Sequence, residues 1–567
     1  MVTGVTQVAV LARFATLVLA LGCCDSPARV KPWRHAPDPT SEAARAPSSP
    51  ALAEVSAAAE VRAARGHTLR IHVDAEPGRL NPLVSPTVWG RRITQGTIFE
   101  PLIRYLPPEP GHTAGRFAPR LAQSWRVMPG GQEIRIELTP GVTFSDGHPM
   151  TSSDVQFTLD AIRDPRKGID HLRSMLADVF AVELITSHEV RLVLNRPSGW
   201  VLRALAEIPI LPMHIYEGSL LAGGQLIGTG PYKLVSNKGG VIHLTRNDRY
   251  WGGKQSIAIA DLEFVHQADA AIALKDAKRG DLDIVPALIP AHWPEQASAP
   301  GLAASFRALE LGGPRMRYLS FNAAHAPLDD AKVRHALALL IDRRSIAKRV
   351  FDGLSRPALW PIWPGGPVSG AEVPIPDFDP GAAAKLLDAA GWMDTDKDGI
   401  RDRDGKQLRL VMIGGEKPVP KDASAPPEKL PRDYFINAAR RIGVVIEVKT
   451  GGESWVTKHV EEGSYDLAEM AWSGMVDMDL TPLLGGKDPQ HAPSPRIERV
   501  LDAMGAAWDP DERGKLATEL AAALGETWTL AGIVADAPQG LVHRRVKNIR
   551  VWDGWVDLAA LGFDDKP

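Results

Sequence analysis

Apolar and polar positions alternate in several short stretches of the chain, the pattern of strands with one face against a core. The clearest examples are His67–Asp74, Glu189–Asn195, Gly240–Asn247, Leu408–Ile413 and Val444–Thr450. Because the side chains of a strand point to opposite faces in turn, a two-residue period predicts a half-buried strand. Each stretch also contains β-branched residues, which favour strands. We therefore predict a strand in each of these places.

A wider spacing predicts helices elsewhere. In the segment Ala331–Val350, apolar residues recur every three or four positions, at Val333, Leu337, Leu340 and Ile341. This spacing places them on one face of a single helix. Asp330 precedes the segment and has a side chain that commonly caps helix N-termini. The segment Asp511–Trp528 also predicts a helix. Strands mixed with helices in this way indicate an α/β fold.

Length and composition limit the possible architectures and functions. The chain has 567 residues, more than the roughly 250–300 that one hydrophobic core usually serves, so at least two lobes are expected. A hydrophobic fraction of 44%, a charged fraction of 23% and a net charge of −3 describe an ordinary globular protein. No basic excess is present that would favour binding to nucleic acid.

The N-terminus has the features of an export signal. Arg13 precedes the apolar run Phe14–Gly22, which is shorter than the ~20 residues that span a bilayer, so we predict a signal peptide over residues 1–22. Gly22 before Cys23 resembles a lipobox, which makes Cys23 the predicted lipidation site and the lipid the membrane anchor. The neighbouring Cys24 is the alternative site. Ordinary secretion without a lipid is the alternative fate.

Residues 23–66 are rich in Ala, Pro, Ser and Arg and contain no aromatic residue after Trp33. A segment of this composition buries too little apolar surface to fold by itself, so we predict a disordered tether between the anchor and the folded body.

The sequence contains none of the common catalytic motifs that we searched for. The phosphate loop G-x-x-x-x-G-K-[ST] and the motifs H-E-x-x-H, G-x-S-x-G and C-x-x-C are all absent. We therefore expect no catalytic residue, no cofactor and no enzyme activity.

One acidic loop has part of a calcium-binding pattern. Carboxylates recur at alternate positions, with glycine at the sixth, and the candidate ligands are Asp394, Asp396, Asp398 and Asp402. The twelfth position, however, is Gly405 instead of the glutamate that completes such loops. The incomplete pattern favours a structural turn, and we predict no metal site here.

Several blocks of the chain together resemble one protein family. In order they are FAPRLAQSW (Phe117–Trp125), PGVTFSDGHPMTSSDVQF (Pro140–Phe157), GTGPY (Gly228–Tyr232), YLSFN (Tyr318–Asn322) and DPGAAAKLLDAAGW (Asp379–Trp392). They resemble motifs of the extracellular solute-binding proteins of family 5, the oligopeptide- and dipeptide-type substrate-binding components of ABC importers. The resemblance extends from about Leu69 to Phe563.

The resemblance implies a two-lobed periplasmic-binding-protein fold of class II, cluster C-like, with an extra inserted domain. Lobe I would consist of residues 67–95, 227–316 and 539–567. The inserted domain II would consist of residues 96–226, and lobe III of residues 317–538. The resemblance also implies a monomer that works with an ABC permease and its ATPase subunits.

In the family the solute is enclosed between the two main lobes. The corresponding residues of this chain are Leu80, Asn81 and Trp89 on one side, and Trp472, Ser473, Gly474, Met475 and Asp477 on the other.

The second group departs from the family pattern. Peptide-binding relatives often have an aspartate where this chain has Met475, and that aspartate holds the ammonium group of the peptide. Leaving a buried ammonium without its carboxylate costs ~3–5 kcal/mol. Either Asp477 or Asp479 therefore substitutes, or the ligand is not a peptide with a free amine. Peptides, opines, oligosaccharides and metal chelates all remain candidate ligands.

The expected function is that of a lipid-anchored, periplasmic or extracytoplasmic protein, which captures a peptide or peptide-like solute by lobe closure and delivers it to a permease. Two alternatives are a ligand sensor or chaperone built on the same fold, and a secreted hydrolase.

Overall fold

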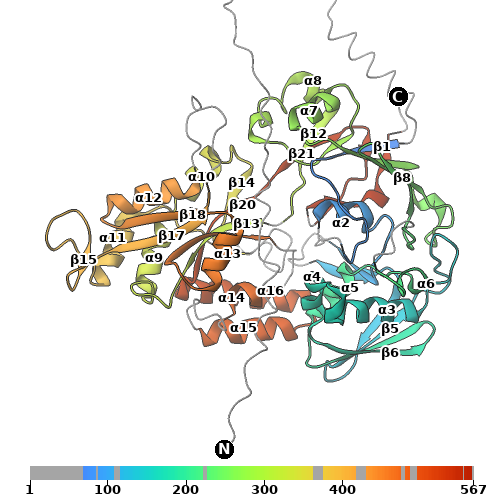
Figure 1. Ribbon diagram of the computed structural model, residues 1–567, viewed down its shortest axis with the longest axis horizontal. Helices are drawn as coiled ribbons and strands as arrows, with labels where there is room; N and C mark the ends of the chain where they lie inside the picture. The colour runs from blue at the N-terminus through green and yellow to red at the C-terminus, as the bar shows by residue number, and fades with distance from the viewer. Residues whose placement is uncertain are drawn as a thin grey trace, which may run out of the picture.

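The computed structural model describes residues 68–84, 87–106, 115–220, 226–313, 315–361, 374–416, 430–473, 479–485, 494–552 and 554–564. The predicted signal peptide, the tether and the lipidation site Cys23 lie outside the described residues. The described chain forms α/β bodies around separate sheets, as the sequence predicts (Figure 1).

The first sheet has seven strands in the order β12-β21-β11-β1-β10-β9-β8. Its strands come from three distant parts of the chain: β1 (Thr68–Val73); then β8 (Tyr232–Lys238), β9 (Val241–Arg246), β10 (Asp261–His266), β11 (Ile284–Val285) and β12 (Phe306–Glu310); and finally β21 (Gln539–His543). Strand β1 lies inside the sheet and runs parallel to β10 and β11. We call this part of the molecule, at the upper right of Figure 1, the seven-stranded body.

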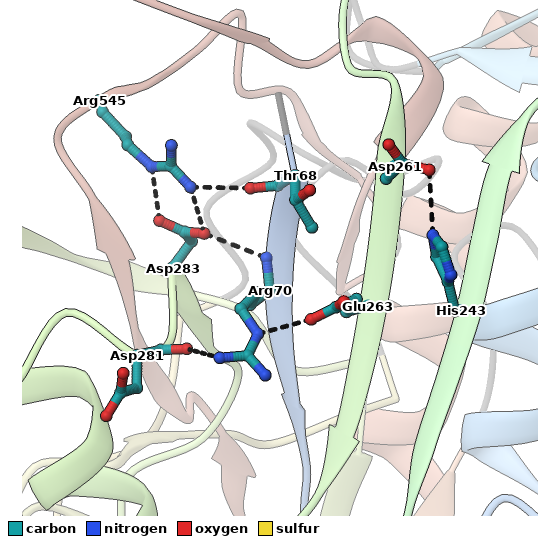
Figure 2. A network of polar contacts seen from close by, with 8 residues as sticks. All are labelled: Thr68, Arg70, His243, Asp261, Glu263, Asp281, Asp283 and Arg545. Atoms are coloured by element: carbon teal, nitrogen blue, oxygen red, sulfur yellow. Dashed lines mark hydrogen bonds and ion pairs between the residues drawn. The ribbon is translucent and has the colours of Figure 1, made fainter. Parts of the chain in front are cut away.

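A polar network joins the three chain segments of the seven-stranded body (Figure 2). Asp283 precedes β11 and is 5% exposed. Its carboxylate accepts hydrogen bonds from Nε and Nη2 of Arg545, both at 2.7 Å, and from the backbone N–H of Arg70 at 3.0 Å. Arg545 Nη2 also donates to the carbonyl of Thr68 at 2.8 Å, and Arg70 Nε donates to Glu263 at 2.6 Å. One buried carboxylate thus connects β1, the middle of the chain and its C-terminal segment.

The second sheet has six strands in the order β14-β20-β13-β19-β17-β18. They are β13 (Arg315–Phe321), β14 (Ser355–Pro357), β17 (Arg409–Gly415), β18 (Val445–Gly451), β19 (Leu467–Ser473) and β20 (Leu530–Asp536). Its helices are α9 (Ala331–Leu339), α10 (Arg343–Arg349), α11 (Pro380–Ala389), α12 (Pro431–Arg441), α13 (Glu453–Glu461), α14 (Thr481–Leu484), α15 (Pro495–Ala506) and α16 (Pro510–Thr527). We call this part, at the left of Figure 1, the six-stranded body.

The strands predicted from alternation are confirmed as β1, β7, β9, β17 and β18. The prediction of one helix over Ala331–Val350 is wrong, because α9 ends at Leu339 and α10 begins at Arg343. Asp342 caps the second helix by accepting a hydrogen bond from the N–H of Ser345 at 3.0 Å. An internal cap of this kind favours a new helix start over continuation. The predicted cap Asp330 is confirmed, since it accepts from the N–H of Lys332 at 2.8 Å.

A third sheet of four strands, in the order β4-β5-β7-β6, lies at the lower right of Figure 1. Its strands are β4 (Ala122–Val127), β5 (Glu133–Leu138), β6 (Val179–Thr186) and β7 (Glu189–Leu194). Its helices are α3 (Ser152–Arg163), α4 (Asp170–Arg173), α5 (Trp200–Glu207) and α6 (Met213–Tyr216). We call this part the four-stranded domain.

The remaining elements are short. They are α2 (Val88–Thr94), α7 (Ala270–Lys278) and α8 (Pro300–Ser305), with the paired strands β2 (Ile103–Leu106) and β3 (Arg116–Pro119), β15 (Asp402–Arg403) and β16 (Lys406–Gln407), β22 (Val546–Lys547) and β25 (Gly562–Phe563), and β23 (Val551–Trp552) and β24 (Trp555–Val556). Among the described residues, no helix combines the length and the apolar character needed to cross a membrane.

The G-T-G-P-Y block attaches the seven-stranded body to the four-stranded domain. A Cβ at Gly228 would come within 2.0 Å of the Ile98 carbonyl oxygen, and one at Gly230 within 2.2 Å of the Thr97 carbonyl oxygen. The N–H groups of Gly230 and Tyr232 donate to these carbonyls, each at 2.9 Å. Glycine is therefore required by close backbone contact at both positions.

Glu100 stabilises the same junction. It is fully buried, and it accepts hydrogen bonds from the Tyr250 hydroxyl at 3.0 Å and from Trp251 Nε1 at 2.8 Å. Arg120 forms an ion pair with it at 2.5 Å. A buried carboxylate needs such partners, so this Tyr-Trp pair has a structural role.

Among the described residues, two large hydrophobic cores divide the molecule into two parts, and a third, small cluster packs beside α7 and α8 in the seven-stranded body. One core runs continuously through the seven-stranded body and the four-stranded domain. A separate core fills the six-stranded body. Since a shared core resists relative motion, we expect the first two parts to move as one unit against the third.

Candidate functional site

Two chain crossings connect the seven-stranded and six-stranded bodies. One leads from β12 to β13, and the other leads from β20 to β21. They lie side by side, because the N–H of Leu311 donates to the Pro538 carbonyl at 3.1 Å. A Cβ at Gly312 would come within 1.9 Å of Pro538 Cγ, so this close approach requires glycine. Two short adjacent crossings have the geometry of a hinge.

A set of ion pairs lies beside the crossings. Asp536, at the end of β20, is 3.2 Å from Arg317 Nε and 3.8 Å from Arg315 Nε. Arg356 on β14 forms an ion pair with Glu310 on β12. The last pair spans the two bodies, so a change of angle at the crossings would alter it.

Parallel strands indicate where the six-stranded body would contact a ligand. Strands β18, β17 and β19 are parallel and adjacent, and they end at Gly451, Gly415 and Ser473. In open α/β sheets, ligands bind outside the carboxyl ends of such strands. The segment that includes Trp472 therefore lies at the expected edge.

The predicted residues of this segment are described only in part. Trp472 is 5% exposed, and its indole Nε1 has no hydrogen-bond partner among the described residues. Ser473 is exposed at the end of β19. The predicted site residues Gly474, Met475 and Asp477 lie outside the described residues.

A buried ion pair packs against the same edge. Glu469 on β19 is 2.9 Å from Arg432 Nη1, at the start of α12, and burial raises the pKa of its carboxyl. A Cβ at Gly414 would lie 2.5 Å from Arg432 Nη1. Glycine at 414 therefore leaves room for the Arg432 side chain beside β17.

The predicted residues on the opposite side are largely buried. Trp89 on α2 is 5% exposed, and its Nε1 donates to Asp74 at 2.5 Å. Its ring packs edge-on against Trp555, with 5.6 Å between the centroids. Leu80 and Asn81 are each 8% exposed. Asn81 donates to the Leu220 carbonyl at 2.7 Å, which fixes the loop after β1.

Trp89 and Trp472 belong to different hydrophobic cores, one in each of the two units. The structure therefore groups the predicted residues into two separate sets, as a site between lobes would require.

Sequence reasoning missed a basic group between α2 and α4. Burial lowers the pKa of His171 on α4, and the positive charge of Arg91 on α2 lowers it further. Arg173, also on α4, pairs with Asp170 at 2.5 Å. The adjacent arginines Arg91 and Arg92 follow Trp89 closely and were a usable signal, whereas nothing in the sequence marked His171 or Arg173.

The side chain of Arg92 packs against aromatic rings and donates a hydrogen bond. Its guanidinium lies over the rings of Trp89 and Trp555, at 5.1 and 4.4 Å from their centroids. It also donates to the Gly554 carbonyl at 3.3 Å. Burial lowers its pKa to about 10. Arg92 therefore stabilises the packing of α2.

The six-stranded body also contacts the four-stranded domain along a seam, formed by the start of α5 and the turn between α15 and α16. The N–H of Gly199 donates to the Gly505 carbonyl at 2.7 Å. The guanidinium of Arg513, which is fully buried, lies 5.4 Å from the centroid of Trp200. Trp508 packs against the core of the other unit. The two units thus touch both at the crossings and at this seam.

The acidic loop has features of a structural turn. The carboxylates of Asp394, Asp396 and Asp398 are exposed and mutually within 4.8 Å. Backbone N–H groups of the loop already donate to them, for example that of Ile400 to Asp398 at 2.8 Å. Asp402 instead accepts from the N–H and hydroxyl of Thr395, at 2.8 and 2.6 Å, so it lies apart from the acidic cluster.

The two α/β units and the paired crossings between them define a class of protein, the two-lobed binding proteins. Residues 116–491 match the family model described as bacterial extracellular solute-binding proteins, family 5. The chain belongs to this family. Membership supports the expectation that the protein is extracellular or periplasmic and is not an enzyme.

Individual relatives agree with this assignment. Protein XP55 of Streptomyces lividans is 28% identical over 476 residues, which cover 80% of this chain and 81% of that protein. The oligopeptide-binding protein AppA of Bacillus subtilis is 30% identical over 372 residues, which cover 62% of this chain and 65% of that protein. The structure of HbpA2 from Haemophilus parasuis superposes with a TM-score of 0.75 at 20% identity, covering 88% of this chain and all of that one. The predicted fold class is thereby confirmed.

Proposed function

We propose that the protein is the solute-binding component of an ABC importer and that it captures a peptide or peptide-like solute by lobe closure. The oligopeptide-binding relative AppA supports this class of solute. The observation that carries the proposal is the presence of two large, separate hydrophobic cores, in units that two adjacent crossings join.

The division into two units supports the proposed boundaries between lobe I and lobe III. We propose that residues 67–95, 227–316 and 539–567 form lobe I, residues 96–226 form the inserted domain, and residues 317–538 form lobe III. Contacts that a solute makes with both lobes exist only in the closed form. The solute therefore shifts the open–closed equilibrium by the difference between its affinities for the two forms.

The proposal includes a membrane anchor. Lipidation at Cys23, followed by the tether of residues 23–66, would hold the binding protein near its permease. Radiolabelled palmitate tests this part: incorporation is expected to be lost in Cys23→Ser and retained in Cys24→Ser. Equal incorporation in both variants would reject Cys23 as the site.

The experiment that tests solute capture combines mass spectrometry with small-angle X-ray scattering. Solute that co-purifies with the full chain is released by denaturation, identified and added back to the emptied protein. The radius of gyration is expected to fall on addition, and the solute is expected to be recovered chemically unchanged. A steadily consumed solute would favour the hydrolase alternative, and compaction by no solute of a broad library would contradict transport.

A further inference from the structure

Three side chains form a basic cluster where the four-stranded domain meets α2. Arg91 lies on α2, and His171 and Arg173 lie on the single turn of α4. Both elements pack into the same hydrophobic core, through Ile93 of α2 and Leu172 of α4. In Figure 1, α4 lies below α2, on the side of the four-stranded domain that is turned toward the six-stranded body.

The cluster contains buried nitrogens without partners. Among the described residues, Nε of Arg91, Nε2 of His171, and Nε and Nη2 of Arg173 are buried and have no hydrogen-bond acceptor. Buried polar atoms are normally hydrogen-bonded, so each exception calls for an explanation. Four such atoms on three neighbouring side chains indicate that the cluster is built to receive acceptors.

The charge of the cluster is positive. Arg91 and Arg173 each carry one positive charge, and Asp170 contributes one negative charge through its pair with Nη1 of Arg173. His171 is half-buried, and burial followed by the charge of Arg91 lowers the pKa of its imidazole, which favours the neutral form. One positive charge therefore remains uncompensated within this group.

We infer that the transported solute carries an anionic group, such as a carboxylate or a phosphate, which binds to Arg91, His171 and Arg173 between α2 and α4. This inference rests on the proposed function and specifies the class of solute for the same site. Guanidinium groups form short, charge-assisted hydrogen bonds with such oxygens, often two at a time. An anion would supply both the acceptors and the negative charge that the cluster lacks.

The cluster lies on one unit of the molecule. α2 and α4 share one hydrophobic core, because Trp89 and Ile93 of α2 belong to the same cluster as Leu172 of α4. The anion subsite is therefore preformed on one unit, and the solute can bind there before the lobes close.

Isothermal titration calorimetry of the full chain tests the inference with matched probes. The pairs are Ala-Glu-NH2 with Ala-Gln-NH2, both amidated at the C-terminus so that no α-carboxylate is present, and succinate with succinamide. The members of each pair differ mainly in charge. The acidic member of a pair is expected to bind about tenfold or more tightly than its amide, which is the effect of one or two charge-assisted hydrogen bonds. This preference is expected to decrease with added salt.

Variants locate the anion on the protein. Arg91→Gln and Arg173→Gln are each expected to remove most of the preference for the acidic probe. Arg91→Lys keeps the charge but not the planar fork, so an intermediate preference is expected. The matched control is Arg166→Gln, in the same domain, whose side chain is 87% exposed and which is expected to behave as wild type. Thermal unfolding of each variant checks that it is folded.

The outcomes separate this inference from the proposed function. Amides that bind as tightly as their acids would overturn the inference and leave solute transport intact. Acidic probes that bind equally to Arg91→Gln and Arg173→Gln would place the anion elsewhere and also overturn it. If no acidic probe binds while another solute compacts the protein, the inference fails and the transport proposal stands.

Discussion

The substitution Asp283→Asn tests how the seven-stranded body is held together. The side chains of Asp283 and Arg545 are only 7% and 13% exposed, so water screens their ion pair weakly. The substitution removes the negative charge and one of the two acceptors that Arg545 uses. Breaking a buried pair by removing one partner typically costs about 3–5 kcal/mol.

The remaining contacts of Arg545 decide where in this range the loss of stability falls. Arg545 keeps its hydrogen bond to the Thr68 carbonyl and its position over the Phe563 ring, 4.1 Å from the centroid. These contacts and its partial exposure favour the lower end. We therefore expect a loss of about 3 kcal/mol in the unfolding free energy of this body.

Urea unfolding followed by circular dichroism measures this loss, fitted with more than one transition if the units unfold separately. The midpoint of one transition is expected to fall while its denaturant dependence stays the same. Asp276→Asn is the matched control, because its partner Arg279 is 56% exposed and such pairs contribute about 1 kcal/mol or less. A loss in Asp283→Asn no larger than in this control would refute the reasoning.

Further predictions concern other parts of the molecule. Gly230→Ala is expected to destabilise the protein by roughly 1–3 kcal/mol, because its Cβ would meet the Thr97 carbonyl. This loss should appear as a lower midpoint of thermal unfolding. The control Gly218→Ala, at a position with open space around it, should change the midpoint little. Burial lowers the pKa of His72 below 6.5, so the unfolded state binds the proton more readily. The unfolding free energy should therefore fall as pH decreases through about 6.5. In urea titrations at several pH values, His72→Gln should weaken this pH dependence, and an unchanged slope of unfolding free energy against pH would contradict the prediction. Trp508→Ala should loosen the seam and weaken solute binding in calorimetry without abolishing it. Millimolar calcium should give no binding heat, since the ligand set of the acidic loop is incomplete; a saturable heat lost in Asp396→Asn would show otherwise.

Local patterns predicted the elements well and their boundaries less well. The alternation in His67–Asp74 gave β1 because that strand has one strongly buried face. The continuous apolar face over Ala331–Val350 concealed a break, since a cap at Asp342 competes with helix continuation and leaves the spacing of apolar residues unchanged. Periodicity is therefore a weak guide to helix ends.

The motifs that revealed the family lie in structural junctions. The G-T-G-P-Y glycines position the four-stranded domain through close backbone contacts. At the same junction, Tyr250 and Trp251 donate hydrogen bonds to the buried carboxylate of Glu100. They identify the fold without specifying the solute. The basic cluster of Arg91, His171 and Arg173 combines positions about 80 residues apart, and their proximity arises from tertiary structure alone.

The position of β21 affects the order in which the protein acquires its structure. Ile284 on β11 pairs with Val542 on β21, and β21 separates β11 from the edge strand β12. A polypeptide emerging from its N-terminal end must therefore hold β11 and β12 incomplete until almost the entire chain has emerged. During this interval β11 presents an unpaired edge, which is a hazard for aggregation. A nonsense mutation that removes only the last strands would consequently leave an otherwise long product unable to finish its first-made sheet.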